Sequence, residues 1–428
     1  MSLATHAAKN YQIRYLRVYL APRTVNNTYD IFIDISNYVI EGKLGKYKRS
    51  IDSDPFSIGF YEESNIKLSF DNADQLFSSG RGYFENKIVD RSKIRVVAGY
   101  YDIHNIKNVE FENTFEGIIE DRSTTLDDAT DTINFTILSY SGVIGKLVTD
   151  PGAVTNGQDF KTALWNLLNR NEVKSLLTLD SRNINPNINL TIDDATFFVG
   201  KQLKTALNAL LLASNSVLKI ENNTLYIADR SPSLSVRFQF FGSRNLVNIY
   251  KLENYTNGLS RSITRVAINT KIFESDNAII NQFGANLKSY ELNFITDDTA
   301  IKSIGESILE EFAYPKPELN LTTDFIGNEI QLLDLVTIDY QGTLLDKNPA
   351  LYGQARYAFS QFVKRSGAIR IDGLTGFKVL GIEHDFQKYT TKLKLRQVGT
   401  GQFDSLISYN TAIYGQGIYD VSTYAQTA

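Results

Sequence analysis

The chain is 428 residues long, 43% hydrophobic and 21% charged, with a formal net charge of −4. This length predicts two or three domains instead of one core. Cysteine is absent, which excludes disulfides, thiolate catalysis and cysteine-ligated metal sites. Lysine and arginine are scattered along the chain, so the sequence does not indicate the basic surface of a duplex DNA-binding protein.

No apolar run approaches the roughly 20 residues that cross a bilayer, and the composition is typical of a soluble globular protein. The N-terminus lacks the continuous apolar stretch of a secretion signal, because Arg14 and Arg17 interrupt it. Histidine occurs at His6, His104 and His384, far apart in the sequence. This distribution leaves little material for histidine-based catalysis or a multi-histidine metal site.

Residues 1–147 are predicted to form an N-terminal β-barrel-like domain. The segments "YLRVYL", "NIKLSF" and "TINFTILSY" alternate apolar and polar residues, which is the pattern of half-buried strands. Turns rich in Gly, Asn, Asp and Pro separate them. Many short strands joined by turns favour a barrel or a sandwich.

Residues 148–232 are predicted to form an α/β unit. After Asp159, apolar residues recur at helical spacing: Phe160, Leu164, Leu167 and Leu168. A second helix is predicted over 197–213. A hairpin follows, with its turn at Asn222-Asn223 because asparagine tolerates a left-handed backbone. The hairpin places two apolar pairs opposite each other: Leu218 and Ile220 against Leu225 and Ile227.

Residues 233–402 are predicted to form a C-terminal β-rich domain with one helix over 297–313. Asp297 and Asp298 favour the start of that helix, and prolines at 315 and 317 stop it. The segments "FKVLGIEHDF" and "TTKLKLRQVG" predict a half-buried antiparallel ribbon. Residues 403–428 are predicted to be an extended tail. The predicted fold class is therefore mainly β with an α/β insert (α+β), in which two β-barrel-like domains flank a helix-plus-hairpin unit.

Four short segments resemble functional motifs. "GVIGKL" (142–147) has its glycines too close together for a phosphate loop and is interpreted as a turn. "DSDPFSIGF" (52–60) and "DDATD" (127–131) lack the ligand pattern of a calcium loop and are interpreted as solvated turns. "EHD" (383–385) places His384 between two carboxylates, but in a strand the flanking side chains point to the opposite face. A catalytic or metal role for His384 is therefore not expected.

An acidic group lies around the predicted loop between "FEGII" and "INFTI". It comprises Glu116, Glu120, Asp121, Asp127, Asp128 and Asp131. One interpretation is a charged loop that joins two paired strands. The other is an acidic rim on an assembly.

Enzyme signatures are weak in this sequence. It contains no G-x-S-x-G elbow, no H-E-x-x-H and no G-x-G-x-x-G after a strand. We therefore expect a protein that is not an enzyme and has no catalytic residues, cofactor or metal. Hydrolysis by a carboxylate pair stays open, since two acids can converge from anywhere in the chain.

Four segments, taken in this order, resemble the baseplate and tail-tip hub proteins of tailed bacteriophages. They are "TFEGIIED…INFTILSY", "QLKTALNALLLASNSVLKIENNTLYIADR", "AIKSIGESILEEFAYPKPELNLTT" and "FKVLGIEHDFQKYTTKLKLRQ". The likeness covers most of residues 12–400 and is one of pattern and order, without an invariant motif.

This resemblance implies a structural subunit of the virion, assembled in the bacterial cytoplasm. Such hubs form trimers in which two related β-barrel domains per chain build a pseudo-sixfold ring between the tail tube or distal tail protein and a spike or central fibre. The ring leaves a channel for DNA, and Glu120, Asp121, Asp127, Asp128 and Asp131 are the candidates to face it. The tail tyrosines Tyr409, Tyr414, Tyr419 and Tyr424 are candidate interface residues.

Two other functions compete with the hub. A carbohydrate-binding tail adhesin would use exposed aromatic platforms, and the chain has 24 tyrosines. Tyrosine also serves protein interfaces. A cell-wall hydrolase would lose its activity on peptidoglycan when one essential acid is neutralised.

Overall fold

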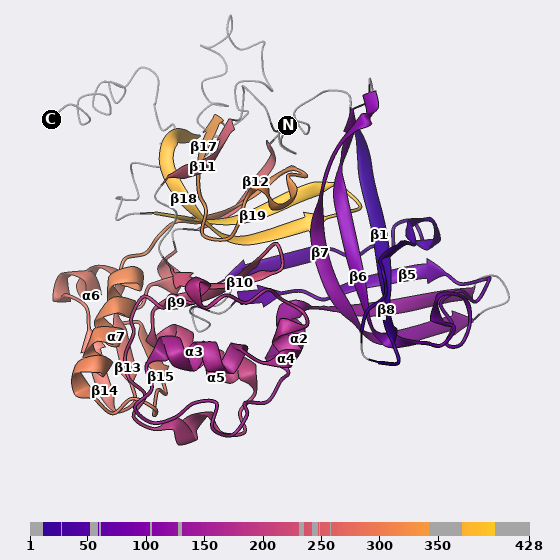
Figure 1. The fold of residues 1–428 in the computed structure, drawn as a ribbon. Coiled ribbons are helices and arrows are strands. Elements are labelled where there is room, and N and C mark those ends of the chain that lie inside the picture. Colours follow the sequence, from indigo (N-terminus) through magenta and orange to yellow (C-terminus); the bar gives the residue numbers. More distant parts are fainter. Residues whose placement is uncertain are drawn as a thin grey trace, which may run out of the picture.

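The computed structural model describes residues 12–26, 28–51, 59, 61–102, 105–126, 131–230, 235–241, 247, 249–256, 258–341 and 370–398. Within these ranges the chain is mainly β, with few helices (Figure 1). The predicted tail with its four tyrosines lies outside the described residues, as do Asp127, Asp128 and nearly all of "DSDPFSIGF".

The first large sheet has six strands in the order β2-β1-β6-β7-β8-β5 and curls into a half-barrel (Figure 1). Its strands are β1 (Gln12–Thr24), β2 (Ile33–Asp34), β5 (Ile66–Asp71), β6 (Lys87–Asp102), β7 (Asn105–Leu126) and β8 (Asp131–Ser139). All neighbouring pairs are antiparallel. The predicted alternation in β5 is confirmed, because Ile66, Leu68 and Phe70 are fully buried while Lys67 is exposed.

The second large sheet has eight strands, six of them in the order β11-β17-β18-β19-β16-β12. These are β11 (Val236–Phe241), β12 (Ile249–Thr256), β16 (Glu318–Asp324), β17 (Leu335–Gln341), β18 (Arg370–Asp385) and β19 (Thr390–Gln397). β18 and β19 form the predicted antiparallel ribbon, in which Leu393 pairs with Ile382 and Leu395 with Val379. β11 and β17 form a parallel pair.

The other two strands of this sheet come from the N-terminal part of the chain. β3 (Tyr47–Ile51) pairs with β18, and β4 (Tyr61–Glu63) pairs with β3. Both strands fall inside the predicted domain 1–147, yet they belong to the sheet of the predicted domain 233–402. Alternation in a sequence assigns side chains to faces but does not name the partner strand, so this crossing was not predicted.

Six helices are described: α2 (Tyr140–Gly145), α3 (Phe160–Leu168), α4 (Asn171–Lys174), α5 (Leu203–Ala213), α6 (Asn277–Phe283) and α7 (Asp298–Phe312). Short 3-10 turns are η1 (Ser36–Tyr38), η2 (Gly82–Phe84), η3 (Ser181–Asn183), η4 (Ala195–Phe198), η5 (Leu259–Arg261) and η6 (Gly327–Glu329). The side chain of Asp159 caps α3 by accepting a hydrogen bond from the Thr162 backbone N–H at 3.0 Å. The predicted stripe on α3 is buried.

Two predicted segments differ from the structure. The helix predicted over 197–213 begins at Leu203, because Gly200 takes a left-handed φ of +69° and separates η4 from α5. Val199, inside the predicted range, lies before the helix and is 59% exposed. "GVIGKL" is not a turn: most of it lies in α2, whose first turn is capped by the Ser139 hydroxyl accepting from the Gly142 N–H.

The predicted hairpin is confirmed residue by residue. In β9 (Ser216–Glu221) and β10 (Thr224–Asp229), Leu218 pairs with Ile227 and Ile220 with Leu225. Asn222 and Asn223 have φ values of +48° and +59°. Left-handed backbone at both central residues matches the twist of a two-residue hairpin turn.

The predicted helix over 297–313 is confirmed as α7, which runs Asp298–Phe312. The Asp297 side chain accepts a hydrogen bond from the Thr299 N–H at 3.0 Å and so caps the helix. α7 packs on a three-stranded sheet of β13 (Arg265–Ile268), β14 (Lys271–Glu274) and β15 (Leu287–Tyr290). Asp193 ties this part to the segment before η4, because its carboxylate accepts from the Thr296 N–H at 2.6 Å.

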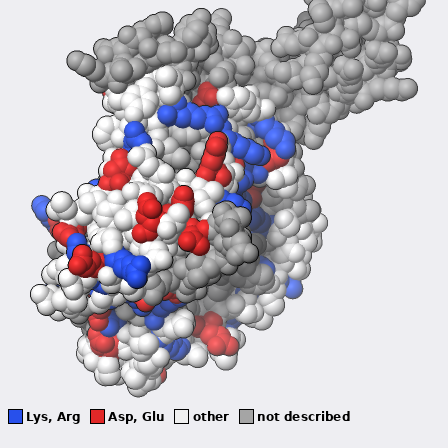
Figure 2. Space-filling view, turned by 90° about the vertical axis from the view of Figure 1, so that its right-hand side faces the viewer, with Lys and Arg blue, Asp and Glu red and all other residues white. Residues whose placement is uncertain are grey.

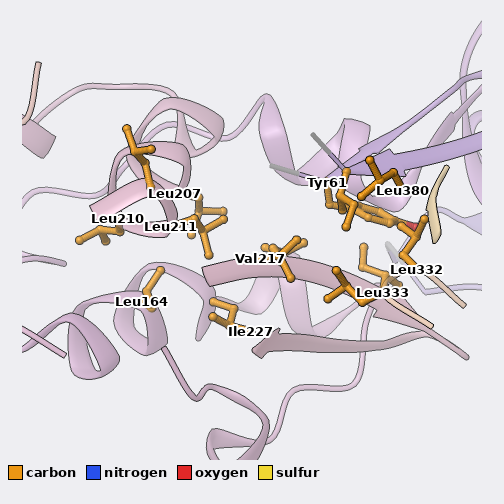
Figure 3. Close-up of a cluster of buried hydrophobic side chains, with 14 of the residues drawn as sticks. Tyr61, Leu164, Leu207, Leu210, Leu211, Val217, Ile227, Leu332, Leu333 and Leu380 are labelled. Carbon is orange, nitrogen blue, oxygen red and sulfur yellow. The ribbon is translucent and has the colours of Figure 1, made fainter. Parts of the chain in front are cut away.

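One apolar core runs from the helices to the second sheet (Figure 3). Leu164 of α3 and Leu207, Leu210 and Leu211 of α5 lie toward one end of the β9–β10 hairpin, and Tyr61, Leu333 and Leu380 lie toward its other end. A second core fills the curled first sheet and takes in Phe325 and Tyr389 from the second. The two sheets therefore meet through buried side chains.

Hydrogen bonds fix this meeting of the sheets. The Tyr100 hydroxyl donates to the Phe325 carbonyl at 2.9 Å. Tyr389, held at φ +61°, donates from its hydroxyl to the Tyr15 carbonyl at 2.7 Å. Buried polar groups paired in this way set the orientation of one sheet on the other.

Candidate assembly surfaces and ionic clusters

Glu116 was predicted as part of the acidic group, but the structure places it in a buried network. Its carboxylate accepts from Arg95 Nε at 2.8 Å, from Asn113 Nδ2 at 3.2 Å and from the Tyr140 hydroxyl. Burial raises the pKa of Glu116, but the Tyr140 hydrogen bond and the Arg95 charge outweigh burial and hold that pKa below its usual value. Glu116 thus joins β7 to α2 and has no exposed charge to offer a partner.

The other predicted acidic residues do not form one described surface. Glu120 is exposed and pairs with Lys146. Asp131 is half-buried at the start of β8. Asp121 lies in β7, although its side chain is outside the described residues, as are Asp127 and Asp128. The face in Figure 2 carries small groups of acidic side chains among lysines and arginines, without one extended field of a single sign.

His384 sits in a buried aromatic environment. It is fully buried, with Nδ1 3.2 Å from the Thr391 hydroxyl and Phe325 and Tyr47 rings nearby. Glu383 and Asp385 point to the other face, where both lie within 3.2 Å of Lys46 Nζ. Burial, and then the Arg49 charge, hold the pKa of His384 well below its usual value, so the ring is neutral.

A cationic cluster lies where α7 ends against the second sheet. We define it as Arg230, Arg261, Lys316, Lys378, Lys394 and Arg396, grouped around Glu311 and Glu318. Glu311 contacts Arg230 Nε at 3.0 Å and Lys378 Nζ at 3.3 Å. Burial raises the pKa of Glu311, but its cationic neighbours outweigh burial and hold that pKa far below its usual value.

Glu318 forms the second centre of the cationic cluster. Its carboxylate lies 2.8 Å from Arg396 Nη2, 3.1 Å from Arg261 Nε and 3.9 Å from Lys394 Nζ. The guanidinium groups of Arg230 and Arg396 lie 5.2 Å and 5.6 Å from the centre of the Phe312 ring. This aromatic ring therefore lies near cations of both centres.

Lys316 differs from the other cations of the cluster in its side-chain contacts. It lies between Pro315 and Pro317, is half-buried, and makes no side-chain hydrogen bond or ion pair within the described part of the chain. Burial lowers the pKa of Lys316, and the positive neighbours Lys378 and Arg396 oppose the attraction of Glu311. Its backbone is held closely, because a Cβ on Gly258 would lie 2.0 Å from the Lys316 carbonyl oxygen.

An exposed aromatic face occupies the outer end of the first sheet. The Tyr15 ring stacks on Phe111 at 5.2 Å and meets Tyr101 edge-on at 5.0 Å. Gly99 lies in register between Tyr15 and Phe111, and its missing side chain leaves room for the two rings to meet. Phe111 is 55% exposed. Neither this face nor the cationic cluster was predicted.

The described residues contain neither a candidate metal site nor a candidate membrane-spanning helix. No group of three or more His, Asp or Glu side chains there is placed to hold a metal ion. No described helix has both the length and the apolar character needed to cross a membrane.

The similarity of this chain to known proteins is one of fold and not of sequence. No protein-family model matches the sequence, and no curated protein matches it. The tail protein from Neisseria meningitidis MC58 superimposes with a TM-score of 0.52 at 12% identity, over 90% of this chain and 97% of that chain. The 43 kDa tail protein of prophage MuSo2 from Shewanella oneidensis superimposes with a TM-score of 0.52 at 10% identity. That match covers 90% of this chain and 98% of that chain.

The chain has the fold of phage tail proteins. This tail-protein fold extends over nearly the whole length of both neighbours. The likeness therefore includes both large sheets and the helical part between them, and it does not depend on one shared subdomain.

The cationic cluster shows what the sequence reasoning missed. The alternation in "TKLKLR" does place Lys392, Lys394 and Arg396 on one face of β19. Nothing local indicates that Arg230 and Lys316, which are 86 residues apart in numbering, reach the same place. The local signal available was a lysine between two prolines shortly after a predicted helix.

Proposed function

We propose that this chain is a structural, non-catalytic subunit of a phage tail hub. Three copies form a ring that joins the tail tube or distal tail protein to a spike or central fibre, in a virion assembled in the bacterial cytoplasm. The observation that carries this proposal is the tail-protein fold over 90% of the chain. We propose that the two large sheets of each chain supply the six barrel-like modules of a trimeric ring.

The ends of the second sheet support a ring. β11 and β12 are the two end strands in its order, so the described sheet does not close on itself. An end strand presents backbone groups that can pair with another chain. We propose that neighbouring copies complete both barrel-like domains, including the one built on the first sheet.

Acidic residues at the β7–β8 connection are proposed to face the channel. Glu120, Asp121, Asp127, Asp128 and Asp131 would repel DNA phosphate and keep the genome from adhering during ejection. The described members support this proposal in part, because Glu120 is exposed. The tail tyrosines Tyr409, Tyr414, Tyr419 and Tyr424 are proposed to pack on a neighbouring subunit through large amphipathic side chains.

The mass of the particle tests the ring. Light scattering on the purified full-length chain over a wide concentration range is expected to show a species of three times the chain mass of 48.2 kDa. Electron microscopy of that species is expected to show an annular particle with the β7–β8 connections at the central passage. A chain that stays monomeric at every concentration contradicts the hub proposal, and acidic residues far from the passage contradict the channel assignment.

A carbohydrate-binding adhesin is the second candidate, because the Tyr15–Tyr101–Phe111 face is an exposed aromatic platform. Sugar rings stack on such platforms through their apolar faces. Under the hub proposal, a glycan array is expected to show no selective binding. Selective binding that is lost in Phe111→Ala and kept in Phe283→Ala, a change outside this face, would favour the adhesin.

A further inference from the structure

We infer that the open edge of β1 in the first sheet receives an added strand from the C-terminal tail of a second copy of this chain. The inference rests on the proposed ring and assigns one of its contacts. On one side, β1 pairs with β6 from Gln12 to Thr24. On the other side, its pairing with β2 begins at Tyr19. We call residues 13–17 on that side the β1 edge, and within the described part of the chain no strand pairs with it.

The first argument is the direction of the backbone groups at the β1 edge. Val18 points its backbone away from β6, because its N–H donates to the Ser36 hydroxyl at 2.8 Å and its carbonyl accepts from the Ile35 N–H at 2.9 Å. Every second residue of an antiparallel strand points the same way, and the register of β1 on β6 is unbroken here. Arg14 and Leu16 therefore direct their N–H and C=O groups outward. Among the described residues these groups have no partner, so they can pair with another strand.

The second argument is the apolar surface beside the β1 edge. Ile13 is 46% exposed and pairs across the sheet with Tyr101, which belongs to the exposed aromatic face. Tyr15, the next residue on the same side of β1, stacks on Phe111. A strand added at the β1 edge would lie beside Ile13 and Tyr15. Its alternate side chains would extend the aromatic face, which favours aromatic and β-branched residues at those positions.

The third argument identifies the occupant as residues 405–413 of the predicted tail. Four β-branched or aromatic residues recur there at every second position: Ile407, Tyr409, Thr411 and Ile413. Residues 399–428 contain no proline, so each of them keeps a backbone N–H for pairing. They contain Asp404 and Asp420 but no lysine or arginine, whereas β1 contains three arginines and no acid. The tail therefore complements the β1 edge in side-chain pattern and in charge.

Two other segments outside the described residues fit the β1 edge less well. Residues 342–369 include Pro349 and carry four basic residues against one acid. Residues 1–11 carry Lys9 and no acid. Both segments would bring positive charge to an arginine-bearing strand, and like charges on adjacent strands are destabilising.

The position of β19 favours the tail of a neighbouring copy over the chain's own tail. Arg14 donates to the Gln387 carbonyl at 3.1 Å, in the turn that precedes β19. β19 then runs for 8 residues from that turn, about 26 Å at the usual spacing of a strand. Residues 399–428 thus leave the second sheet at the end remote from their own β1 edge. A contact between two different surfaces of identical chains can close into a ring.

Hydrogen exchange on the full-length oligomer measures whether the β1 edge is covered. Thr411→Pro removes one N–H from the added strand. We expect it to speed exchange at the Arg14 and Leu16 amides at least about tenfold, and removal of residues 399–428 to do the same. Thr427→Pro, in the same tail but outside residues 405–413, is the matched control and should match the wild type.

Cross-linking shows which copy supplies the strand. Because the chain has no cysteine, Ile13→Cys and Tyr409→Cys can be prepared as two separate single-thiol proteins. After the two are mixed and their subunits exchange, a flexible bismaleimide is expected to link one chain to the other. Ile272→Cys, at an exposed position on β14, is the control and should not be linked to Tyr409→Cys.

The outcomes separate this inference from the proposed function. If the wild type never oligomerises, the ring and its contact both fail. If the ring forms but Thr411→Pro and the removal of residues 399–428 both leave exchange at the β1 edge unchanged, the ring stands and the assigned contact is wrong. If a chain that carries both cysteines is linked to itself and never to another chain, the tail covers its own edge and the inference is overturned.

Discussion

Glu311→Gln is expected to lower the free energy of unfolding by about 3 kcal/mol. The substitution keeps the shape of the side chain and removes its charge. Arg230 and Lys378, whose side chains are 2% and 9% exposed, then lose their buried counter-ion. Removing one member of such a pair leaves an uncompensated buried charge, which costs far more than losing a surface ion pair. Urea unfolding of monomeric protein at neutral pH measures the effect.

The neighbouring Glu310→Gln is the control, because Glu310 lies on the exposed face of the same helix. It is expected to change the stability by less than about 0.5 kcal/mol. The pKa of Glu311 is held below its unfolded value of 4.5, so its stabilisation is complete above that pH and is lost progressively below it. The wild type and Glu311→Gln should therefore converge on acidification. A Glu311→Gln protein as stable as the wild type at pH 7 would show that the cluster does not depend on this carboxylate.

Glu112→Gln is expected to stabilise the protein at alkaline pH by an amount on the order of 3 kcal/mol. Glu112 lies in β7 at the meeting of the two sheets, where its carboxylate accepts from the Asn328 N–H. Burial raises the pKa of Glu112 to about 7, against the opposing effects of the Asn328 hydrogen bond and Arg49; Glu329 adds to the rise. Glutamine keeps a carbonyl oxygen for Asn328 and carries no charge to bury.

The sign of the pH dependence follows from linkage. Because the folded pKa of Glu112 lies above its unfolded value of 4.5, the folded chain holds the proton more tightly. The contribution of Glu112 to stability is therefore full below about pH 4.5 and is lost as the pH rises to about 7. Unfolding curves at pH 4 and pH 8 should show equal stability of the two proteins at the first pH and a more stable variant at the second.

Glu120→Gln, a charge removal on the exposed part of the same strand, is the control and should leave this pH dependence unchanged. A Glu112→Gln protein that is less stable than the wild type at pH 8 would contradict the assignment. In that case the attraction of Arg49 for the ionised carboxylate would outweigh the free energy needed to bury its charge.

The local structure could be predicted wherever short-range chemistry decides it. The caps at Asp159 and Asp297 and the Asn222-Asn223 turn all depend on groups within a few residues of each other. Alternation in β5 depends only on which face of the strand is buried. Two local predictions were wrong. The helix predicted from residue 197 begins only at Leu203, because Gly200 takes a left-handed backbone conformation before it. The segment "GVIGKL", predicted as a turn because of its glycines, lies mostly in α2.

The candidate site depended on contacts between distant parts of the chain. Glu116 is acidic by sequence, yet Arg95 and Tyr140 make it a buried structural group. The cationic cluster exists because α7, β16, β18 and β19 bring their charged ends together. No local pattern marks Arg230 or Lys378 as neighbours of Glu311.

By itself, the sequence determined the strand-rich composition, helices α3 and α7, the β9–β10 hairpin, the buried face of β5 and the absence of cysteine chemistry. Tertiary structure alone decided that β3 joins β18 and β4 joins β3, that the sheets meet through Tyr100 and Tyr389, and that cations from distant segments pair with Glu311 and Glu318. The physical reason is the distance along the sequence between the interacting residues. Capping, turns and alternation are settled within a few residues, whereas strand partners and ion clusters are selected by burial of the whole chain.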